Sequence, residues 1–285
     1  SSGGVAIIQI LGQLEPFELA KLTIDDAKFA HLFTQSSRLA FADRNRYIAD
    51  SSFVNVPTQG LIDKEYIKQR SALIDLDKDM GTAEAGQPAG ALVQADDNAF
   101  ELPSTSHISI VDQAGNAISM TTSVEMGFGS ALMVEGFILN NQLTDFSLNP
   151  KSNGQWVANR LEPGKRPRSS MAPMMVFNQD SSLKLVLGSP GGSRIINYVA
   201  QTMIAILDWQ LDPQSAISLP HMTNRNKVTT LEKGTDLVKL KSALEAKGHK
   251  VMVRDLNSGI HAIELSNGKL SGGADPRREG KAVGY

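Results

Sequence analysis

The stretch Ser104-Thr105-Ser106-His107-Ile108-Ser109-Ile110-Val111-Asp112 marks an abrupt change in the pattern of the sequence. Before it, residues 77–102 are rich in Gly, Ala, Asp and Gln and show almost no apolar period. After it, short runs with strand character alternate with Gly and Asn. Thr105 is either an ordinary strand residue, since Thr favours strands, or a latent N-terminal nucleophile. In the second case, cleavage before Thr105 frees an α-amine that acts as the base for the hydroxyl of the same residue.

The residues after this point predict a β-hairpin in the middle of a sheet. Polar and apolar residues alternate from 106 to 112, residues 113–116 supply a turn, and residues 117–123 return as a second strand. Thr121, Thr122 and Ser123 thereby bring hydroxyl groups to the same end of the hairpin as Thr105. Thr-rich strands are also common without any catalytic role, so this pattern leaves both interpretations open.

Composition excludes several classes of protein. The net charge is −2 and the charged residues are of mixed sign, which argues against a general nucleic-acid or membrane-surface binder. The chain has no Cys, so disulfides, zinc–thiolate sites and a cysteine nucleophile are excluded. No apolar run approaches the ~20 residues that a membrane span needs. The chain starts Ser-Ser-Gly-Gly without Met or a signal-peptide pattern, which is typical of a segment of a longer protein.

The chain divides into three parts. Residues 1–76 are predicted to be helical, and His31 is expected on the surface of a helix. Residues 77–104 are too long for an ordinary connection and are expected to be functional or disordered; a flexible leader that ends at a scissile bond would be both. Residues 105–285 carry the candidate chemistry. The motif Asp75-x-Asp77-x-Asp79 lacks the Glu of a calcium loop, and the His residues lack metal-ligand spacing, so neither a metal nor a cofactor is expected.

Two further stretches have chemical potential. The glycine loop 188–193 joins a short strand to a long apolar helix, but it lacks the Walker and dinucleotide-binding patterns. The backbone N–H groups of Gly191 and Gly192 could instead face a developing anion, as in an oxyanion hole. Residues 140–146 set amides and a carboxylate on a loop, which could bind an ammonium group or could be ordinary turn chemistry.

Four motifs occur in an order that resembles a known family. They are Thr105-Ser-His-Ile-Ser-Ile-Val-Asp112, Leu139-Asn-Asn-Gln-Leu-Thr-Asp-Phe146, Arg166-Pro-Arg-Ser-Ser-Met171 and Gly188-Ser-Pro-Gly-Gly-Ser-Arg194. Together they closely resemble the small subunit of γ-glutamyltranspeptidases, which are N-terminal-nucleophile hydrolases. Ala42-Asp-Arg44 and the terminal Ala274-Asp-Pro-Arg-Arg278 fit as well. The resemblance implies an α/β fold, an αββα sandwich that is incomplete at its N-terminal side.

The resemblance also implies a role for each site residue. Thr105 would be the nucleophile, exposed by autocleavage of the Ser104–Thr105 bond, and Ser123 would assist it. The α-amino group of a γ-glutamyl substrate would be held by Gln142 and Asp145, and its α-carboxylate by Ser169 and Ser170. Gly191 and Gly192 would form the oxyanion hole. The acyl-enzyme would then pass its acyl group to water or to an acceptor amine, with no cofactor.

Two departures from the family matter. Glu125 stands where well-studied members carry Asn, and a carboxylate there also suits an ammonium group. The front of the large subunit, with the arginine that clamps the substrate carboxylate, is not in this chain, so it is expected as a partner. Alternative functions are an amide acylase for another acyl group, such as glutaryl, and a non-catalytic module that binds amino acids. The family resemblance alone favours a periplasmic or extracellular location.

Overall fold

The computed structural model describes residues 2–97, 99 and 104–284. Ser1, Tyr285 and five residues of the expected leader, 98 and 100–103, lie outside the described part. The helices are α1 (Ser2–Leu14), α2 (Ala27–Tyr47), α3 (Thr58–Leu61), α4 (Lys64–Ser71), α5 (Ile195–Leu207), α6 (Pro213–Ser218) and α7 (Lys241–Ala246). Short 3₁₀ turns are η1 (Leu19–Lys21), η2 (Gln142–Asp145), η3 (Gly192–Arg194) and η4 (Asp236–Leu240).

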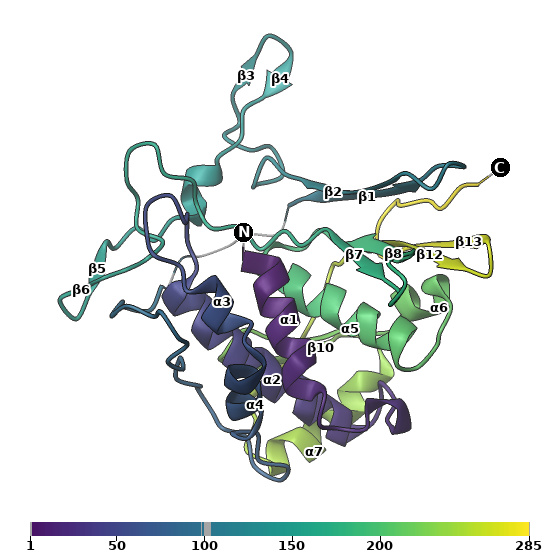
Figure 1. The fold of residues 1–285 in the computed structure, drawn as a ribbon, viewed down its shortest axis with the longest axis horizontal. Coiled ribbons are helices and arrows are strands. Elements are labelled where there is room, and N and C mark those ends of the chain that lie inside the picture. Colours follow the sequence, from purple (N-terminus) through teal and green to yellow (C-terminus); the bar gives the residue numbers. More distant parts are fainter. Residues whose placement is uncertain (1, 98, 100–103, 285) are drawn as a thin grey trace.

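A four-stranded antiparallel sheet in the order β13-β12-β8-β7 supports the rest of the fold. Its strands are β7 (Met174–Phe177), β8 (Leu183–Gly188), β12 (His261–Ser266) and β13 (Lys269–Ala274). Figure 1 shows α1 and α5 below this sheet and the hairpin of β1 (Ser106–Val111) and β2 (Ala117–Thr122) above it. Leu185 and Leu187 of β8 are buried in one core with apolar residues of α1, α2 and α5, because alternate residues of a strand face the same side of its sheet. A second sheet packs against α2, and its strand order is β11 (Val251–Arg254), β10 (Thr229–Glu232) and β9 (Met222–Asn224).

Six of the remaining strands in the described residues form three two-stranded antiparallel units, and the other three form the second sheet. They are β1 (Ser106–Val111), β2 (Ala117–Thr122), β3 (Met133–Val134), β4 (Phe137–Ile138), β5 (Lys151–Ser152), β6 (Gln155–Trp156), β9 (Met222–Asn224), β10 (Thr229–Glu232) and β11 (Val251–Arg254). β1 pairs with β2, β3 with β4, and β5 with β6.

The sequence predicted that the hairpin of β1 and β2 would lie in the middle of a sheet, and this prediction is wrong. Within the described residues, the two strands pair only with each other. The hairpin is stacked on the four-stranded sheet through its polar face. Ser119 donates to the carbonyl of Leu187 at 3.0 Å and Ser109 donates to that of His261 at 3.4 Å. The opposite face carries exposed apolar residues: Ile108, Ile110, Ile118 and Met120. Hydroxyl groups thus hold the hairpin to the sheet, and its apolar face points outward.

The prediction that His31 lies on the surface of a helix is wrong. His31 lies on α2 and is fully buried, with Nδ1 2.8 Å from Nε2 of His249 and Nε2 2.7 Å from the carbonyl oxygen of Asp75. A carbonyl can only accept, so Nε2 of His31 carries a proton, and in the neutral ring Nδ1 then accepts from Nε2 of His249. Helical periodicity did not reveal this burial, because residues distant in sequence cover this side of α2.

Buried ion pairs fasten the segment between α4 and β1 to the body of the protein. Asp79 lies 2.9 Å from Arg38 of α2, and Asp97 lies 2.8 Å from Arg168. All four side chains are at most 4% exposed. Among the described residues of this segment, Ala95 forms an isolated β-bridge with Val157. The boundaries expected after residues 76 and 104 stay predictions.

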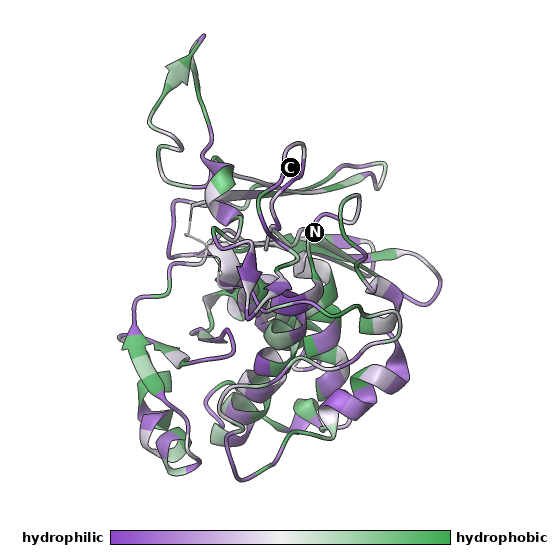
Figure 2. Ribbon diagram, turned by 90° about the vertical axis from the view of Figure 1, so that its left-hand side faces the viewer, coloured by the Kyte–Doolittle hydropathy of each residue, from purple (hydrophilic) through white to green (hydrophobic). Residues whose placement is uncertain are grey.

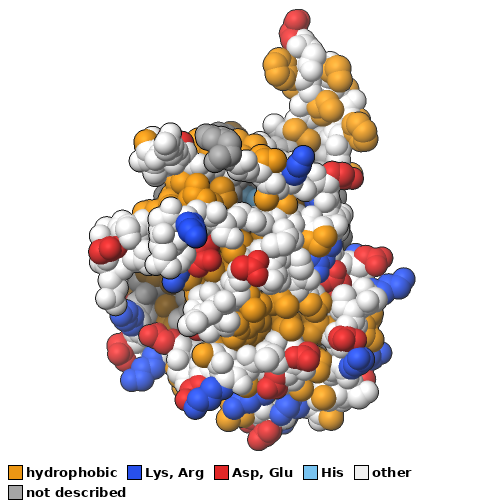
Figure 3. Space-filling view, turned by 90° about the vertical axis from the view of Figure 1, so that its right-hand side faces the viewer, with side chains coloured by type: hydrophobic (Ala, Val, Ile, Leu, Met, Phe, Trp, Pro, Cys, Tyr) orange, Lys and Arg blue, Asp and Glu red, His pale blue; other side chains and the backbone are white. Residues whose placement is uncertain are grey.

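The hairpin of β3 and β4 projects from the body of the molecule (Figure 2). Its apolar side chains are exposed, among them Phe128, Met133 and Phe137 at 74%, 67% and 74%. Figure 3 shows orange hydrophobic side chains along this projection. None of the helices in the described ranges has the length and apolar character needed to cross a membrane.

Candidate active site

The bond between Ser104 and Thr105 lies opposite Ser123. Antiparallel pairing of Ser106 with Thr122 brings the residues before β1 next to those after β2. Ser123 Oγ donates to the carbonyl oxygen of Ser104 at 2.5 Å and accepts from Thr105 Oγ1 at 3.3 Å. The backbone N–H of Glu125 donates to the same Ser123 oxygen at 2.9 Å. The serine hydroxyl therefore contacts both the predicted nucleophile and the carbonyl that this nucleophile would attack.

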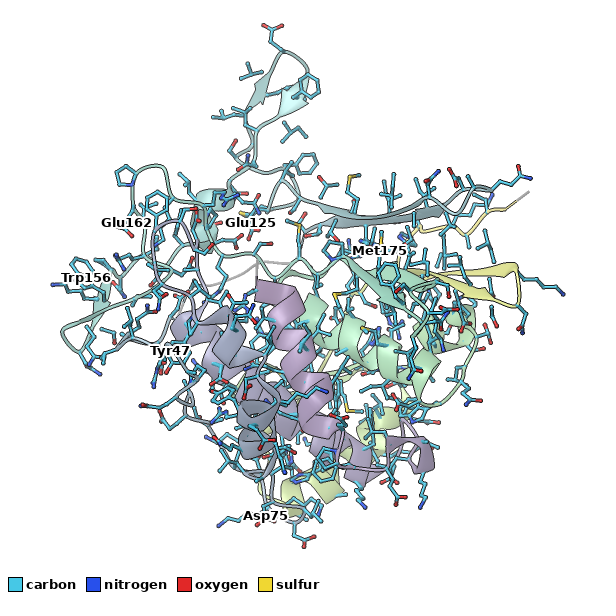
Figure 4. The ribbon with its side chains drawn as sticks, viewed as in Figure 1. Tyr47, Asp75, Glu125, Trp156, Glu162 and Met175 are labelled. Atoms are coloured by element: carbon cyan, nitrogen blue, oxygen red, sulfur yellow. The ribbon has the colours of Figure 1, made fainter. Side chains whose placement is uncertain are left out.

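Two buried carboxylates lie beside this point, at the base of the projecting hairpin. Glu125 follows β2 and Asp145 ends η2, and each is 5% exposed. The side-chain amide of Gln142 bridges them, at 3.2 Å from Glu125 Oε2 and 3.3 Å from Asp145 Oδ2. Figure 4 shows Glu125 where the projection meets the body. Glu125 has φ +76°, a backbone conformation that is uncommon for residues other than Gly and persists only where the surroundings fix it.

The backbone of Asp145 is fixed by a buried amide. Asn159 Nδ2 donates to the carbonyl of Asp145 at 2.8 Å and to Asp97 Oδ2 at 2.9 Å. The carbonyl oxygen of the same amide accepts from the backbone N–H of Arg168 at 2.9 Å. Because the Asp97–Arg168 pair closes this network, a residue of the expected leader supports the position of Asp145.

The two serines of the third motif are held by residues near the start of the chain. Ser170 Oγ accepts from Arg44 Nη2 at 2.5 Å, and Ser2 donates to the carbonyl of Ser169 through both its N–H and its Oγ, at 3.0 and 2.7 Å. Arg44 Nε also donates to Ser2 Oγ at 2.9 Å. Arg44 is only 2% exposed. Its contact with Ser170 was not foreseen from the sequence; the only signal was its place in the motif Ala42-Asp-Arg44.

The glycine loop follows β8 and turns into α5 through η3. Gly191 has φ +138° and Gly192 φ +58°, both in the range that favours glycine. A Cβ on Gly191 would lie 2.7 Å from a ring carbon of Tyr198, so any side chain there would collide with α5. The loop therefore needs glycine for its conformation at both positions and for close packing at Gly191.

A small hollow, partly open to solvent, joins these pieces. Eight of the predicted site residues line it, together with Met171 and Ile195: Thr105, Ser123, Glu125, Gln142, Asp145, Ser169, Ser170 and Gly192. Gly191 and Ser104 are not among the lining residues and adjoin two of them in sequence. No group of three or more His, Asp or Glu side chains suited to a metal ion occurs in the part of the chain that the structure describes.

His107 is only two positions from Thr105 in the sequence, but its ring contacts neighbouring strand residues and not the hollow. Its ring nitrogens lie 2.8 Å from Thr121 Oγ1 and 3.1 Å from Ser109 Oγ. Burial, together with nearby His261, lowers the pKa of His107 to about 4, so the ring is neutral at pH 7. A side chain at Gly188 would collide with this ring. His107 thus fills the space between the hairpin and β8.

The model of the gamma-glutamyltranspeptidase family matches residues 1–285. The chain belongs to this family. The glutathione hydrolase proenzyme of Bacillus subtilis (strain 168) is 36% identical over all of this chain and 49% of its own length. The acylase ACY 1 proenzyme of Pseudomonas sp. (strain SE83) is 32% identical over 99% of this chain and 48% of its own length. The crystal structure of a cephalosporin acylase from Bacillus halodurans superposes with a TM-score of 0.84 at 27% identity, over 99% of this chain and 49% of the acylase chain.

These similarities confirm the predicted gamma-glutamyltranspeptidase family and the α/β fold of the N-terminal-nucleophile hydrolase type. The chain spans about half the length of the curated relatives it matches. In the described residues, helices lie on one side of the four-stranded sheet and the β1–β2 hairpin is stacked on its other side (Figure 1). Relatives named as glutathione hydrolases and as acylases both resemble this member of the gamma-glutamyltranspeptidase family, so family membership alone does not choose the acyl group.

Proposed function

We propose that this chain is part of a γ-glutamyltransferase precursor that cleaves itself before Thr105 and then uses Thr105 as its nucleophile. The contacts of Ser123 carry the proposal. Its hydroxyl donates to the Ser104 carbonyl at 2.5 Å and accepts from Thr105 Oγ1 at 3.3 Å. A donor placed on a carbonyl oxygen stabilises the negative charge that develops there during attack.

In the proposed cleavage, Thr105 Oγ1 attacks the carbonyl carbon of Ser104. The C–N bond of the Ser104–Thr105 peptide breaks, the proton lost by the Thr105 hydroxyl passes to the departing nitrogen, and an ester joins Ser104 to Thr105 Oγ1. Water then hydrolyses this ester, leaving a carboxylate on Ser104 and a free α-amine on Thr105. Residues 105–285 become the small subunit, and residues 1–104 become the end of the large subunit.

The matured site would then carry out acyl transfer. Thr105 Oγ1 attacks the γ-amide carbonyl of the substrate and gives its proton to the Thr105 α-amine, which passes the proton to the leaving amine. The N–H groups of Gly191 and Gly192 stabilise the oxyanion. Water or an acceptor amine then attacks the γ-glutamyl ester, and the hydroxyl of Thr105 is restored. None of these steps needs a cofactor.

The charges around the hollow favour a γ-glutamyl group. Glu125 and Asp145 are two buried carboxylates bridged by the neutral amide of Gln142, an arrangement that matches an α-ammonium group. Ser169 and Ser170 would bind the α-carboxylate. Because Ser170 Oγ accepts from the Arg44 guanidinium, its O–H becomes a stronger donor.

An amide acylase for another acyl group is the second candidate, because acylases are among the similar proteins. A glutaryl group lacks the α-ammonium that the carboxylates Glu125 and Asp145 would bind. We therefore expect the full-length protein to cleave γ-glutamyl anilide at least tenfold faster than glutaryl anilide. Faster cleavage of glutaryl anilide would support the acylase instead. Reversible amino-acid binding by a chain that never cleaves before Thr105 would support a non-catalytic binding module.

The missing partner of this chain would be the front of the large subunit. The chain spans about half the length of its relatives, and the family's substrate-clamping arginine is expected in the other half. We therefore expect residues 1–285 alone to turn over γ-glutamyl anilide poorly or not at all. Activity of this segment equal to that of the full-length protein would overturn the expectation.

A further inference from the structure

The C-terminal segment after β13 brings a cation to the predicted nucleophile. Arg278 Nη1 donates to the carbonyl oxygen of Thr105 at 3.4 Å. The same guanidinium donates to the carbonyls of Ser258 at 2.8 Å and Asn257 at 3.1 Å. Its three nitrogens therefore join the loop before β12 to the first residue of the predicted small subunit, and Arg278 itself lies 173 positions from Thr105 in the sequence.

The surroundings fix the side chain of Arg278. A Cβ on Gly259 would lie 2.8 Å from Arg278 Cδ and 2.5 Å from Pro190 Cγ of the glycine loop. Because Gly259 has no side chain, Arg278 and Pro190 of the glycine loop can both pack against its backbone. Farther along the segment, a Cβ on Gly280 would lie 2.3 Å from the ring of His261, and His261 Nδ1 lies 2.7 Å from the carbonyl oxygen of His107 in β1. The C-terminal segment is therefore packed along β1.

The neighbouring Arg277 is different. It lies 2.5 Å from Glu232 and 3.1 Å from Asp275, so two carboxylates balance its charge. Within the described residues, Arg278 bonds to backbone carbonyls and to no carboxylate, so its positive charge acts on the surroundings of Thr105.

From these contacts we infer that Arg278 is a positioning residue that holds the carbonyl of Thr105 and keeps the freed α-amine of Thr105 in its uncharged, basic form. The inference rests on the proposed function, because only cleavage before Thr105 creates this amine. The amine and the carbonyl of one residue are joined through Cα, so the guanidinium lies roughly 6 Å from the amine. A positive charge at that distance disfavours a second one.

The other charged groups around Thr105 make such a cation necessary. Glu125 and Asp145 line the hollow and favour an ammonium form. Arg44 lies behind Ser170, and Arg194 ends η3. The histidines of β1 and β12, His107 and His261, lie along the packed sheets, and Glu279 next to Arg278 is exposed. An ordinary α-amine has a pKa of about 8, and the two carboxylates would raise it further. Arg278 opposes them.

The test compares pH profiles in the full-length, self-cleaved protein. Arg278→Gln removes the charge, Arg278→Lys keeps it, and Arg254→Gln removes the charge of an exposed arginine on β11. We expect the acid limb of kcat/KM for γ-glutamyl anilide to move up by roughly 0.5 to 2 pH units in Arg278→Gln. In Arg278→Lys and Arg254→Gln the limb should stay within about 0.3 units of wild type, a margin small beside that shift.

The outcomes separate this inference from the proposed function. A matured Arg278→Gln variant whose rate falls equally at every pH, with an unchanged limb, would overturn the role of the charge and leave the nucleophile assignment intact. A wild-type protein without cleavage before Thr105 would overturn the proposed function itself. If Arg278→Gln does not mature, the two parts on either side of the Ser104–Thr105 bond can be co-expressed, and removal of an initiator Met then exposes Thr105. This gives a pH profile without self-cleavage. The same shift of the acid limb is then expected, and its absence would overturn the role of the charge.

Discussion

Ser123 Oγ lies 2.5 Å from the carbonyl oxygen of Ser104. This contact crosses the end of the β1–β2 hairpin and joins residues 19 positions apart. It places a proton donor on the one carbonyl that self-cleavage before Thr105 must activate. The register of the hairpin, with Ser106 opposite Thr122, fixes this geometry, so one serine would take part in maturation and later lie beside the mature nucleophile.

Removal of the Ser123 hydroxyl should slow maturation. Loss of one oxyanion donor typically costs about 10²–10³ in rate, so we expect Ser123→Ala to cleave that much more slowly and Ser123→Thr to cleave at a rate near wild type. Gel densitometry of the full-length protein over time measures both rates. Ser119→Ala, which removes a hydroxyl bonded to the carbonyl of Leu187 in the sheet, is the control. Wild-type cleavage in Ser123→Ala would contradict the role given to this serine.

Neutralising Glu125 should weaken binding of substrates that carry an α-ammonium. Hydrogen bonds to charged groups contribute about 1.5–3 kcal/mol, so Glu125→Gln should raise KM for γ-glutamyl anilide by about 10- to 100-fold. For glutaryl anilide, which has no ammonium, KM should fall or stay unchanged. Glu135→Gln, at the exposed turn between β3 and β4, is the matched control. Equal changes for the two substrates would show that Glu125 does not bind the amino group.

The buried pair of Asp97 and Arg168 should be important for stability. Both side chains are at most 2% exposed, and removing one partner of a buried ion pair costs about 3–5 kcal/mol, because the other charge stays buried. We expect Asp97→Ala to lower the free energy of unfolding by about that amount in urea titration. Asp236→Ala removes an exposed partner of Lys239 and should change it by less than about 1 kcal/mol. Similar effects of both substitutions would argue against the network around Asp145.

Acid should destabilise the protein through its buried histidines. Burial lowers the pKa values of His31 and His249, that of His249 to about 4. Above pH ~6.5 both rings are neutral in the folded and unfolded chain, so their contribution to stability is fully present. As the pH falls below ~6.5, the unfolded chain takes up protons that the folded chain does not bind, which lowers the free energy of unfolding by about 1.4 kcal/mol per pH unit for each ring until the pH reaches the folded-state pKa of that ring.

The slope of Tm against pH between 5 and 6.5 tests this claim. His249→Gln keeps an N–H donor for His31 and loses one titrating ring, so its slope should be shallower than that of wild type. Buried His107 and His221, whose pKa values lie at about 4 and 3, remain and keep part of the slope. An identical slope in His249→Gln would mean that this ring accepts a proton in the folded state.

The family and much of the local structure could be predicted from the sequence, because they depend on residues near one another in the chain. The alternation after Thr105 predicts the hairpin, and the glycines of residues 188–192 predict a tight turn between a strand and a helix. Ordered motifs indicated the family, and six of the predicted site residues within them line one hollow: Thr105, Gln142, Asp145, Ser169, Ser170 and Gly192. Their catalytic and binding roles remain proposals.

Contacts between distant residues could not be predicted in the same way. Arg44 and Ser170 are 126 positions apart, and His31 and His249 are 218 apart. Periodicity shows which side of a helix is apolar, but the polar side of α2 is buried as well, because ion pairs and hydrogen bonds satisfy its charged and polar groups. The stacking of the β1–β2 hairpin on the four-stranded sheet likewise depends on carbonyls of β8 and β12, which alternation within the hairpin does not reveal.

If Thr105 becomes an N-terminal nucleophile, the purified full-length protein should show it in intact mass and N-terminal sequencing. We expect two fragments, one of which begins at Thr105, and a single uncut chain in Thr105→Ala. The same measurement on residues 1–285 alone shows whether this segment cleaves without its partner. A wild-type full-length protein that remains one uncut chain after prolonged incubation would rule out Thr105 as an N-terminal nucleophile.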